Sequence, residues 1–235
     1  MLKLEGLKFG YTIACCKEPI NIDIYKGSFF SITGANGVGK STLIKTILGD
    51  TPMLNGNVFL NGKDTKSIDL FEKAKLISIV SSKFNTSLNL TVKDILNHAD
   101  IVNQKNVFFT TNHSFELKIL TVLSDLGVSD LIDSQFNRLS SGQQQLILIA
   151  RAILQNTSII ILDEPTAFLD VKNKLLIFNL LKKLSTDGKL IILISHDIDL
   201  VYKYSNSILF LGKEINEIVD KKNISLDDFY QKFSV

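Results

Sequence analysis

Nine consecutive residues in the first fifth of the chain have the types and the spacing that bind phosphate. They are Gly34, Ala35, Asn36, Gly37, Val38, Gly39, Lys40, Ser41 and Thr42. Glycines let the backbone bend so that successive N–H groups point at phosphate oxygens, and a helix starting behind them adds the positive end of its dipole. Lys40 would reach the β- and γ-phosphates, and Ser41 would offer a hydroxyl ligand to Mg²⁺. This is the P-loop pattern, and it predicts a nucleotide site.

Two carboxylates follow a second segment, at residues 158–162, which reads Ser-Ile-Ile-Ile-Leu. We expect Asp163 to end a strand beside the P-loop strand and to hold Mg²⁺ through its water shell. Glu164 would point the other way and polarise the attacking water. Ligands in open α/β sheets bind at such carboxyl ends of strands. An Asp-Glu pair after a strand is often an ordinary solvated turn, but Pro165 and the P-loop upstream favour the catalytic interpretation.

The elements that must position these residues can be read from the apolar pattern. A strand at 28–33 leads into the P-loop, and a helix at 39–48 with one apolar face follows it, ended by Gly49. The segments 158–162 and 190–194 are apolar without alternation, which is typical of strands buried on both faces of a parallel sheet. The helices expected to precede these two strands cover residues 143–154 and 171–184.

The rest of the chain predicts two further layers. Alternating apolar residues in the first third indicate antiparallel strands, with turns at Asn55-Gly56 and Asn61-Gly62. Helices are predicted at 92–99 and 115–126, with a polar loop at 103–112 between them. A strand at 76–80, a hairpin near 212–213 and a helix near 226–233 complete the pattern.

These elements predict one α/β domain over residues 1–235. Its P-loop NTPase core would comprise about 1–83 and 139–235, with a mainly parallel sheet and an antiparallel β layer. The residues from about 84 to 138 would form an inserted helical subdomain.

Composition and charge bound the class of protein. Lys and Arg (26) nearly balance Asp and Glu (24) and no basic run occurs, so nucleic acid is not an expected partner. The longest apolar runs are far shorter than the ~20 residues of a membrane-spanning helix, and the N-terminus lacks a signal-peptide pattern. We expect a cytoplasmic protein that sits on a membrane by binding something inside it. The adjacent Cys15 and Cys16 are interpreted as reduced thiols without a structural role.

Four further segments resemble motifs of the ABC ATPase family, in the family's order and over essentially the whole chain. They are Tyr11, in the place of the aromatic residue that stacks on adenine; Leu139-Ser140-Ser141-Gly142-Gln143, similar to the signature sequence; Ala167-Phe168-Leu169-Asp170, similar to the D-loop; and Ser195-His196-Asp197, which contains the switch histidine. Each alone would be weak. Together with the P-loop and the carboxylate pair they are highly specific.

The resemblance implies a shared mechanism. Two cassettes would face each other head to tail, with each ATP between the P-loop of one and the signature of the other. Ser140 and the N–H groups of Ser141 and Gly142 would face the γ-phosphate of the partner's nucleotide, and Gln143 and Asp170 would belong to the same nucleotide site. Lys40, Glu164 and His196 would be the catalytic residues, with His196 sensing the γ-phosphate.

The cofactors and partners implied by the family are ATP, Mg²⁺, a second ABC ATPase subunit, a transmembrane permease and a substrate-binding protein. We expect a homodimer, and a related second cassette is the alternative. The location implied is the cytoplasmic face of the plasma (inner) membrane, where hydrolysis would drive the permease.

The sequence departs from the family pattern at two places. Ser141 stands where the signature usually has glycine, and its backbone donor is retained. The glutamine that the family places after the strand at 76–80 is absent, and Ser82 stands there instead. Three interpretations remain open: Ser82 acts through a water molecule, Asn85 or Asn89 substitutes, or turnover is slow. We favour the water bridge.

The kind of transporter that this sequence resembles is indicated by only a few residues. Segments 89–92, 168–170 and 196–200 look most similar to cassettes that import ferric siderophores, haem or cobalamin. An exporter cassette for lipid, drug or haem is the alternative within the family. A soluble ABC ATPase of translation or DNA repair would usually carry two cassettes or long coiled coils, which this chain lacks. A plain P-loop binding protein or kinase would leave the signature-like segment unexplained.

Overall fold

The central layer is a six-stranded sheet in which five neighbouring strands are parallel. The structure is a computed structural model, and it describes residues 1–81, 89–101 and 113–232. In spatial order the strands are β10 (Asn216–Asp220), β9 (Ser207–Leu211), β3 (Phe29–Thr33), β8 (Leu190–Ile194), β7 (Ile159–Asp163) and β6 (Ile77–Val80), with β10 antiparallel to β9. Every residue of β3 and β8 is buried, because helices or a second sheet cover both faces. The predicted parallel sheet is confirmed.

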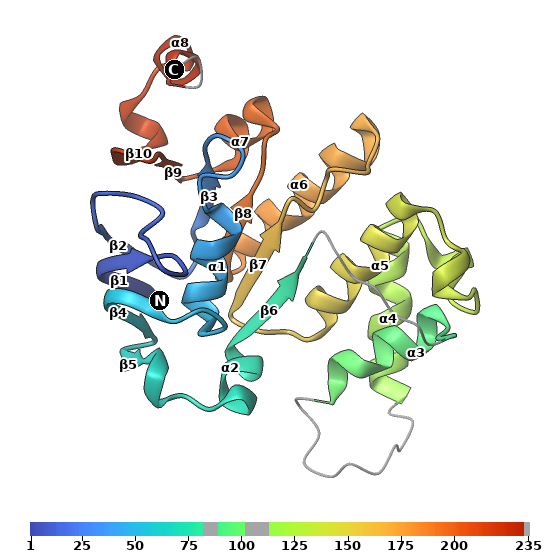
Figure 1. Cartoon of the computed structure of the whole chain (residues 1–235). Coiled ribbons are helices and arrows are strands. Elements are labelled where there is room, and N and C mark those ends of the chain that lie inside the picture. Colours follow the sequence, from blue (N-terminus) through green and yellow to red (C-terminus); the bar gives the residue numbers. More distant parts are fainter. Residues whose placement is uncertain (82–88, 102–112, 233–235) are drawn as a thin grey trace.

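An antiparallel sheet forms the second layer. Its order is β2 (Ile20–Ile24), β1 (Leu2–Phe9), β4 (Met53–Leu60) and β5 (Lys63–Asp64). Helix α1 (Lys40–Leu48) lies between this sheet and the parallel one (Figure 1). One hydrophobic cluster joins all three, for example through Leu4, Leu43 and Ile192. The helix behind the P-loop is therefore held on two sides.

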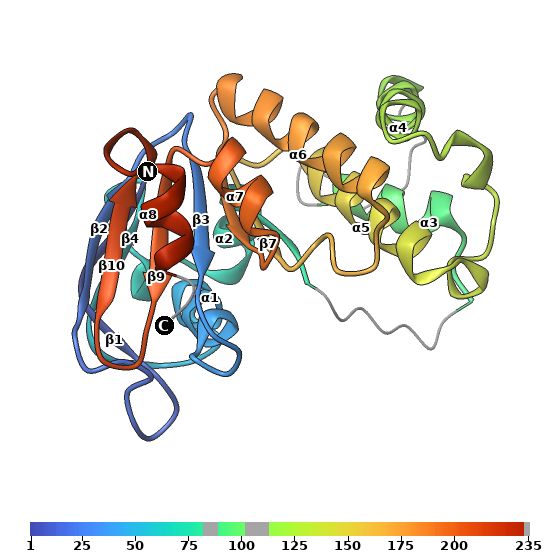
Figure 2. The ribbon, with the colours of Figure 1, turned by 90° about the horizontal axis from the view of Figure 1, so that it is seen from above.

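The other face of the parallel sheet is covered by helices. They are α5 (Ser141–Leu154) and α6 (Val171–Thr186), with α3 (Val92–Asn97) and α4 (His113–Asp125) packed beyond α5. Both views place α3 and α4 far from α1 (Figures 1 and 2). A second cluster runs continuously from Ile160 in the sheet through Ile147 in α5 to Ile119 in α4. The boundaries of a helical subdomain at about 84 and 138 stay a prediction.

Three short helices complete the described chain: α2 (Leu70–Leu76), α7 (Ile198–Tyr204) and α8 (Leu226–Gln231). Helix α8 packs on α7 and β9 through Phe229, whose ring centroid lies 5.0 Å from that of Tyr202. Single 3₁₀ turns occur at Thr65–Ser67, His98–Asp100, Ser129–Leu131, Phe136–Arg138 and Lys221–Asn223. Within the described ranges, no helix is both long and apolar enough to cross a bilayer.

The prediction of a turn at Asn55-Gly56 is wrong. Both residues lie inside β4, opposite a bulge in β1 where the register shifts between Glu5 and Lys8. A side chain at position 56 would collide with the carbonyl oxygens of Glu5 and Gly6, so glycine is needed for close approach of two strands. The second predicted turn is confirmed, since Asn61 and Gly62 have φ values of 49° and 82° and join β4 to β5.

The prediction that Asp163 ends a strand beside the P-loop strand is also wrong. Strand β7 pairs with β8 and β6, and β8 lies between β7 and the P-loop strand β3. The local apolar pattern of a strand carries no information about its neighbours. The polar loop predicted at 103–112 lies outside the described residues.

Candidate functional site

The P-loop connects the end of β3 to the start of α1. Gly39 is the N-cap of α1 with a φ of 107°, and a β-carbon there would overlap the side chain of Cys15. Only glycine fits this combination of backbone angle and close contact. Ala35, Asn36 and Gly37 are exposed, and the first turn of α1 has no acidic residue. The helix thus presents its N–H groups to solvent in the geometry that binds anions.

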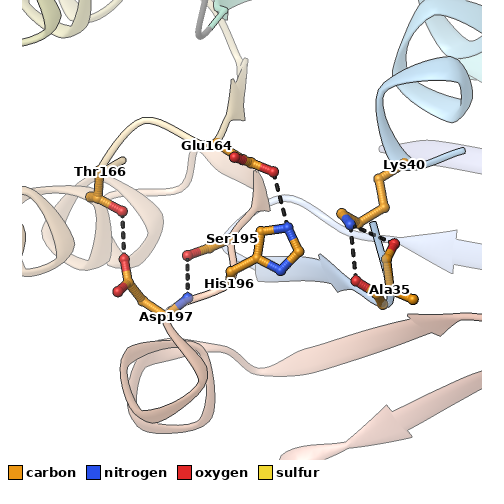
Figure 3. A network of polar contacts seen from close by, with 8 residues as sticks. Ala35, Lys40, Glu164, Thr166, Ser195, His196 and Asp197 are labelled. Atoms are coloured by element: carbon orange, nitrogen blue, oxygen red, sulfur yellow. Dashed lines mark hydrogen bonds and ion pairs between the residues drawn. The ribbon is translucent and has the colours of Figure 1, made fainter. Parts of the chain in front are cut away.

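Lys40 lies across the mouth of this loop. Its Nζ donates to the carbonyl oxygens of Gly34 and Ala35 at 2.9 and 3.0 Å (Figure 3). Burial lowers the pKa of Lys40, and the nearby Glu164 and Asp163 carboxylates oppose that shift. Two neutral carbonyl oxygens are weaker partners for an ammonium group than phosphate oxygens, so this side chain is suited to exchange them for a nucleotide.

Ser41 and Asp163 come together although 122 positions separate them in the sequence. Burial raises the pKa of the Asp163 carboxyl group, and a hydrogen bond from the Ser41 side chain opposes the shift. A hydroxyl and a carboxylate at one point form a hard-oxygen donor pair, which fits Mg²⁺ when phosphate oxygens and water supply the remaining ligands. Within the described ranges, no group of three or more His, Cys, Asp or Glu side chains that could hold a metal ion is found.

Glu164 and His196 point toward each other from neighbouring strands (Figure 3). Oε1 of Glu164 lies 3.0 Å from Nε2 of His196. Glu164 has a φ of 51°, and its N–H donates to the carbonyl oxygen of Ile194 at 3.0 Å. His196 follows the end of β8 by two residues. Strand β8, which lies between β7 and the P-loop strand β3, therefore positions the histidine beside Glu164. A carboxylate bonded to an imidazole can accept a proton from water.

The signature-like segment caps helix α5. The N–H of Gln143 donates to the Ser140 Oγ at 3.2 Å, and the N–H of Ser140 donates to the Gln143 Oε1 at 3.0 Å. This capping box leaves the N–H groups of Ser141 and Gly142 without partners within the helix. Ser140 and Ser141 are exposed. The start of α5 therefore also presents helix N–H groups that could bind an anion, although its extended, side-chain-capped N-cap differs from the left-handed Gly39 N-cap of α1.

The remaining predicted site residues take different positions. Asp170 caps α6 by accepting from the N–H of Asn173 at 2.8 Å, and the carbonyl oxygen of Phe168 lies against Gly142. The D-loop-like segment thus contacts the signature-like segment of the same chain. Tyr11 follows β1 and is 64% exposed. A hollow of about 610 Å³ lies between that loop and the P-loop, lined in part by Ile13 and Val38, but Tyr11 is not part of its lining.

Some polar contacts at the site were not predicted. Asp197 lies within hydrogen-bonding distance of Thr166 and Lys174, and the sequence offered only the position of Asp197 beside His196 as a signal. Ser82 and Asn85, two of the candidates for the missing glutamine, lie outside the described residues. Asn89 accepts a hydrogen bond from the Asn137 Nδ2 at 2.8 Å.

Comparison with known proteins agrees with this geometry. The family model described as ABC transporter matches residues 18–167. The zinc uptake system ATP-binding protein ZurA of Listeria innocua is 31% identical over 216 residues, which are 92% of this chain and 84% of that protein. The iron(3+)-hydroxamate import ATP-binding protein FhuC of Bacillus subtilis is 32% identical over 213 residues, which are 90% and 79% of the two chains.

Solved structures give the same result. The dimeric structure of MJ0796, a bacterial ABC transporter cassette, superposes with a TM-score of 0.84 at 27% identity, covering 95% of this chain and all of that one. A post-hydrolysis state of MJ0796 bound to ADP and Pi has a TM-score of 0.82 at 28% identity, with the same coverage. The P-loop, the Glu164–His196 pair and these relationships together place the chain in the ABC transporter family, as an ATP-binding and ATP-hydrolysing subunit.

Proposed function

We propose that this chain is the motor subunit of an importer that takes up an iron chelate, such as a siderophore or haem, or cobalamin. The observation that carries the motor function is a site split into two parts. The P-loop, Asp163, Glu164 and His196 lie at one edge of the sheet, whereas Ser140 begins a different helix whose donors face solvent. A second copy placed head to tail would bring its own Ser140 to the nucleotide and complete the site.

Each side chain then has a role in the proposed site. The P-loop backbone and Lys40 bind the phosphates, and Ser41 and Asp163 would hold Mg²⁺, which neutralises phosphate charge when bound. Glu164 accepts the proton of the attacking water, and His196 contacts the γ-phosphate. Tyr11 stacks on adenine. The partner's signature segment, residues 139–143, closes the far side of the triphosphate.

Exposed apolar side chains support the partners proposed here. Phe168 and Val171, on either side of Asp170, are 56% and 73% exposed, as expected for a D-loop that packs on the second copy. Leu117 and Leu120 on α4 are 53% and 47% exposed, and we assign them to the face that meets a permease. A substrate-binding protein would act on the opposite side of the membrane, and the motor would sit on its cytoplasmic face.

Uptake measurements test the cargo. A host strain that lacks this gene, complemented with the unmutated chain, should take up radiolabelled ferric siderophore, haem or cobalamin, and complementation with Glu164→Gln should not restore uptake. FhuC is named for iron(3+)-hydroxamate import and ZurA for zinc uptake, so ⁶⁵Zn²⁺ is the matched control cargo. If the strain that lacks the gene lost uptake of zinc but of none of the other cargoes, the proposed cargo would be wrong. Efflux of any cargo on ATP hydrolysis would contradict import.

Replacing Asp163 with asparagine should stabilise the protein and remove its activity. Burial raises the pKa of Asp163, so the folded state holds the proton more tightly than the unfolded chain does. Ionisation of Asp163 therefore lowers the free energy of unfolding as pH rises from its unfolded pKa through its folded pKa. Asp163→Asn should raise the nucleotide-free melting temperature at pH 7 by roughly 2 °C, and lower Mg²⁺-dependent ATP turnover about 100-fold.

Calorimetry and a phosphate-release assay measure the two effects. The exposed Asp125, at the end of α4, supplies the control, because Asp125→Asn should change neither quantity. A lower melting temperature for Asp163→Asn would show that the carboxylate stabilises the fold. Retained turnover would show that it does not hold the metal ion.

A further inference from the structure

We infer that Lys174 is a positioning residue for ATP hydrolysis, which acts through Asp197 to hold His196 against Glu164. The inference rests on the roles proposed above for His196 and Glu164. It adds a connection from that pair to α6, the helix that begins at the D-loop-like segment. We call Thr166, Lys174 and Asp197 the α6 clamp.

The clamp uses both oxygens of one carboxylate. Lys174 Nζ lies 2.7 Å from Asp197 Oδ1, and Thr166 Oγ1 donates to Asp197 Oδ2 at 2.7 Å (Figure 3). The side chains of Lys174 and Asp197 are 25% and 28% exposed, so solvent screens this ion pair less than it screens a pair on the open surface. Each oxygen of the carboxylate therefore has its own partner, Lys174 on α6 and Thr166 on the loop after β7.

The position of Asp197 in the chain makes this arrangement informative. Asp197 is the N-cap of α7, yet its side chain makes no capping hydrogen bond. Aspartate at an N-cap usually accepts from an N–H of the first turn, which stabilises the helix. Here the carboxylate turns away from its own helix and binds Thr166 and Lys174 instead. In place of a capping contact within α7, the carboxylate joins the loop before α7 to the loop after β7 and to α6.

His196 is held from both ends of a short connection. Between β8 and α7 the chain has three residues, Ser195, His196 and Asp197. On one side, the N–H of Glu164 is bonded to the carbonyl oxygen of Ile194, the last residue of β8. On the other side, the clamp fixes Asp197, whose N–H also donates to the Ser195 Oγ at 3.0 Å. Within the described part of the chain, the imidazole between them makes its polar contact with Glu164, at 3.0 Å.

The surroundings leave room for His196 to move if the clamp is removed. A hollow of about 140 Å³ is lined by Glu164, Thr166, Lys174, His196 and other residues of the two loops. Apolar packing therefore does not fix this connection from that side. Helix α6 itself is anchored independently, because Ile177, Phe178 and Leu181 are fully buried. Loss of the ion pair should loosen the histidine and leave the helix folded.

Three variants test this inference. Lys174→Met keeps the length of the side chain and removes its charge, and should lower kcat about tenfold while KM for ATP and the affinity for ADP stay within about twofold. Lys174→Arg restores a cation and should retain at least about half of the kcat. Lys183→Met, at an exposed position near the other end of α6, should match the unmutated protein. A kcat within twofold of normal for Lys174→Met would overturn the inference.

A double-mutant cycle separates this inference from the proposed function. If Lys174 acts through His196, the double variant Lys174→Met/His196→Ala should be no slower than His196→Ala alone. Losses that multiply would show that Lys174 acts by another route and would overturn the inference. If His196→Ala turned over ATP normally, the proposed role of the histidine would fail and the inference with it. A slow His196→Ala beside a normal Lys174→Met would reject the inference alone.

Discussion

Glu164→Gln should bind ATP normally, hydrolyse it about 10²–10⁴-fold more slowly, and accumulate as an ATP-bound dimer. Glutamine has the shape of glutamate and can still accept a hydrogen bond from the His196 Nε2, which lies 3.0 Å from the carboxylate. It cannot take a proton from water. Binding and closure should therefore remain while the chemical step is lost, and the closed state should persist because nothing converts its nucleotide to ADP.

Single-turnover phosphate release and size-exclusion chromatography with ATP and Mg²⁺ measure the two effects. Glu18→Gln, an exposed position on the loop between β1 and β2, is the matched control and should behave as the unmutated chain. Normal phosphate release by Glu164→Gln would mean that another group accepts the proton. Slow release without a stable dimer would mean that Glu164 contributes to closure itself.

The local parts of this site could be predicted because they follow from local physics. The glycines before Lys40 and the apolar segment before Asp163 are each sufficient to indicate a loop or a strand. The helix predicted at 171–184 is α6, at Val171–Thr186, because a long amphipathic segment with a capping aspartate at its start is a strong signal.

The order of the strands in the sheet and the contacts between distant side chains could not be predicted in the same way. Nothing in the residues of β7 says that β8 lies between it and the P-loop strand, yet this order creates the Glu164–His196 contact. The bond from Lys174 to Asp197 spans 23 positions and the bond from Thr166 spans 31, so neither has a local signature. Helices α2 and α7, with seven residues each, are too short to show a helical period.

The Asn55-Gly56 segment illustrates a competing effect. The dipeptide favours a tight turn in isolation, and the same glycine also fits opposite a bulge, where no side chain could be accommodated. In the folded protein β4 pairs with β1, and Gly56 lies opposite the bulge and forms no turn. At Asn61-Gly62 no close approach requires the glycine, because a β-carbon on Gly62 would meet no atom within 4 Å, and the local turn preference is realised.

Ser140→Arg should leave nucleotide binding unchanged and abolish closure of the dimer. The P-loop, Lys40 and Asp163 of the same chain are unaltered, so the affinity for ADP should stay within about twofold. A guanidinium group at the start of α5 would occupy the space that the proposed mechanism reserves for the partner's γ-phosphate. ATP turnover should fall about 100-fold or more, as expected when donors to a reacting phosphate are displaced.

Loss of the N-cap is a separate effect of this substitution and requires its own control. Ser140 accepts from the Gln143 N–H at 3.2 Å, and Ser225 accepts from the Asp228 N–H at the same distance at the start of α8. Ser225→Arg should therefore reproduce a cap loss of about 1 kcal/mol while ATP turnover stays normal. For the unmutated chain, turnover per subunit should fall on dilution below the dimer dissociation constant. If Ser140→Arg instead hydrolysed ATP at the unmutated rate, one protomer would contain a complete site, and the donors at the start of α5 would have no part in it.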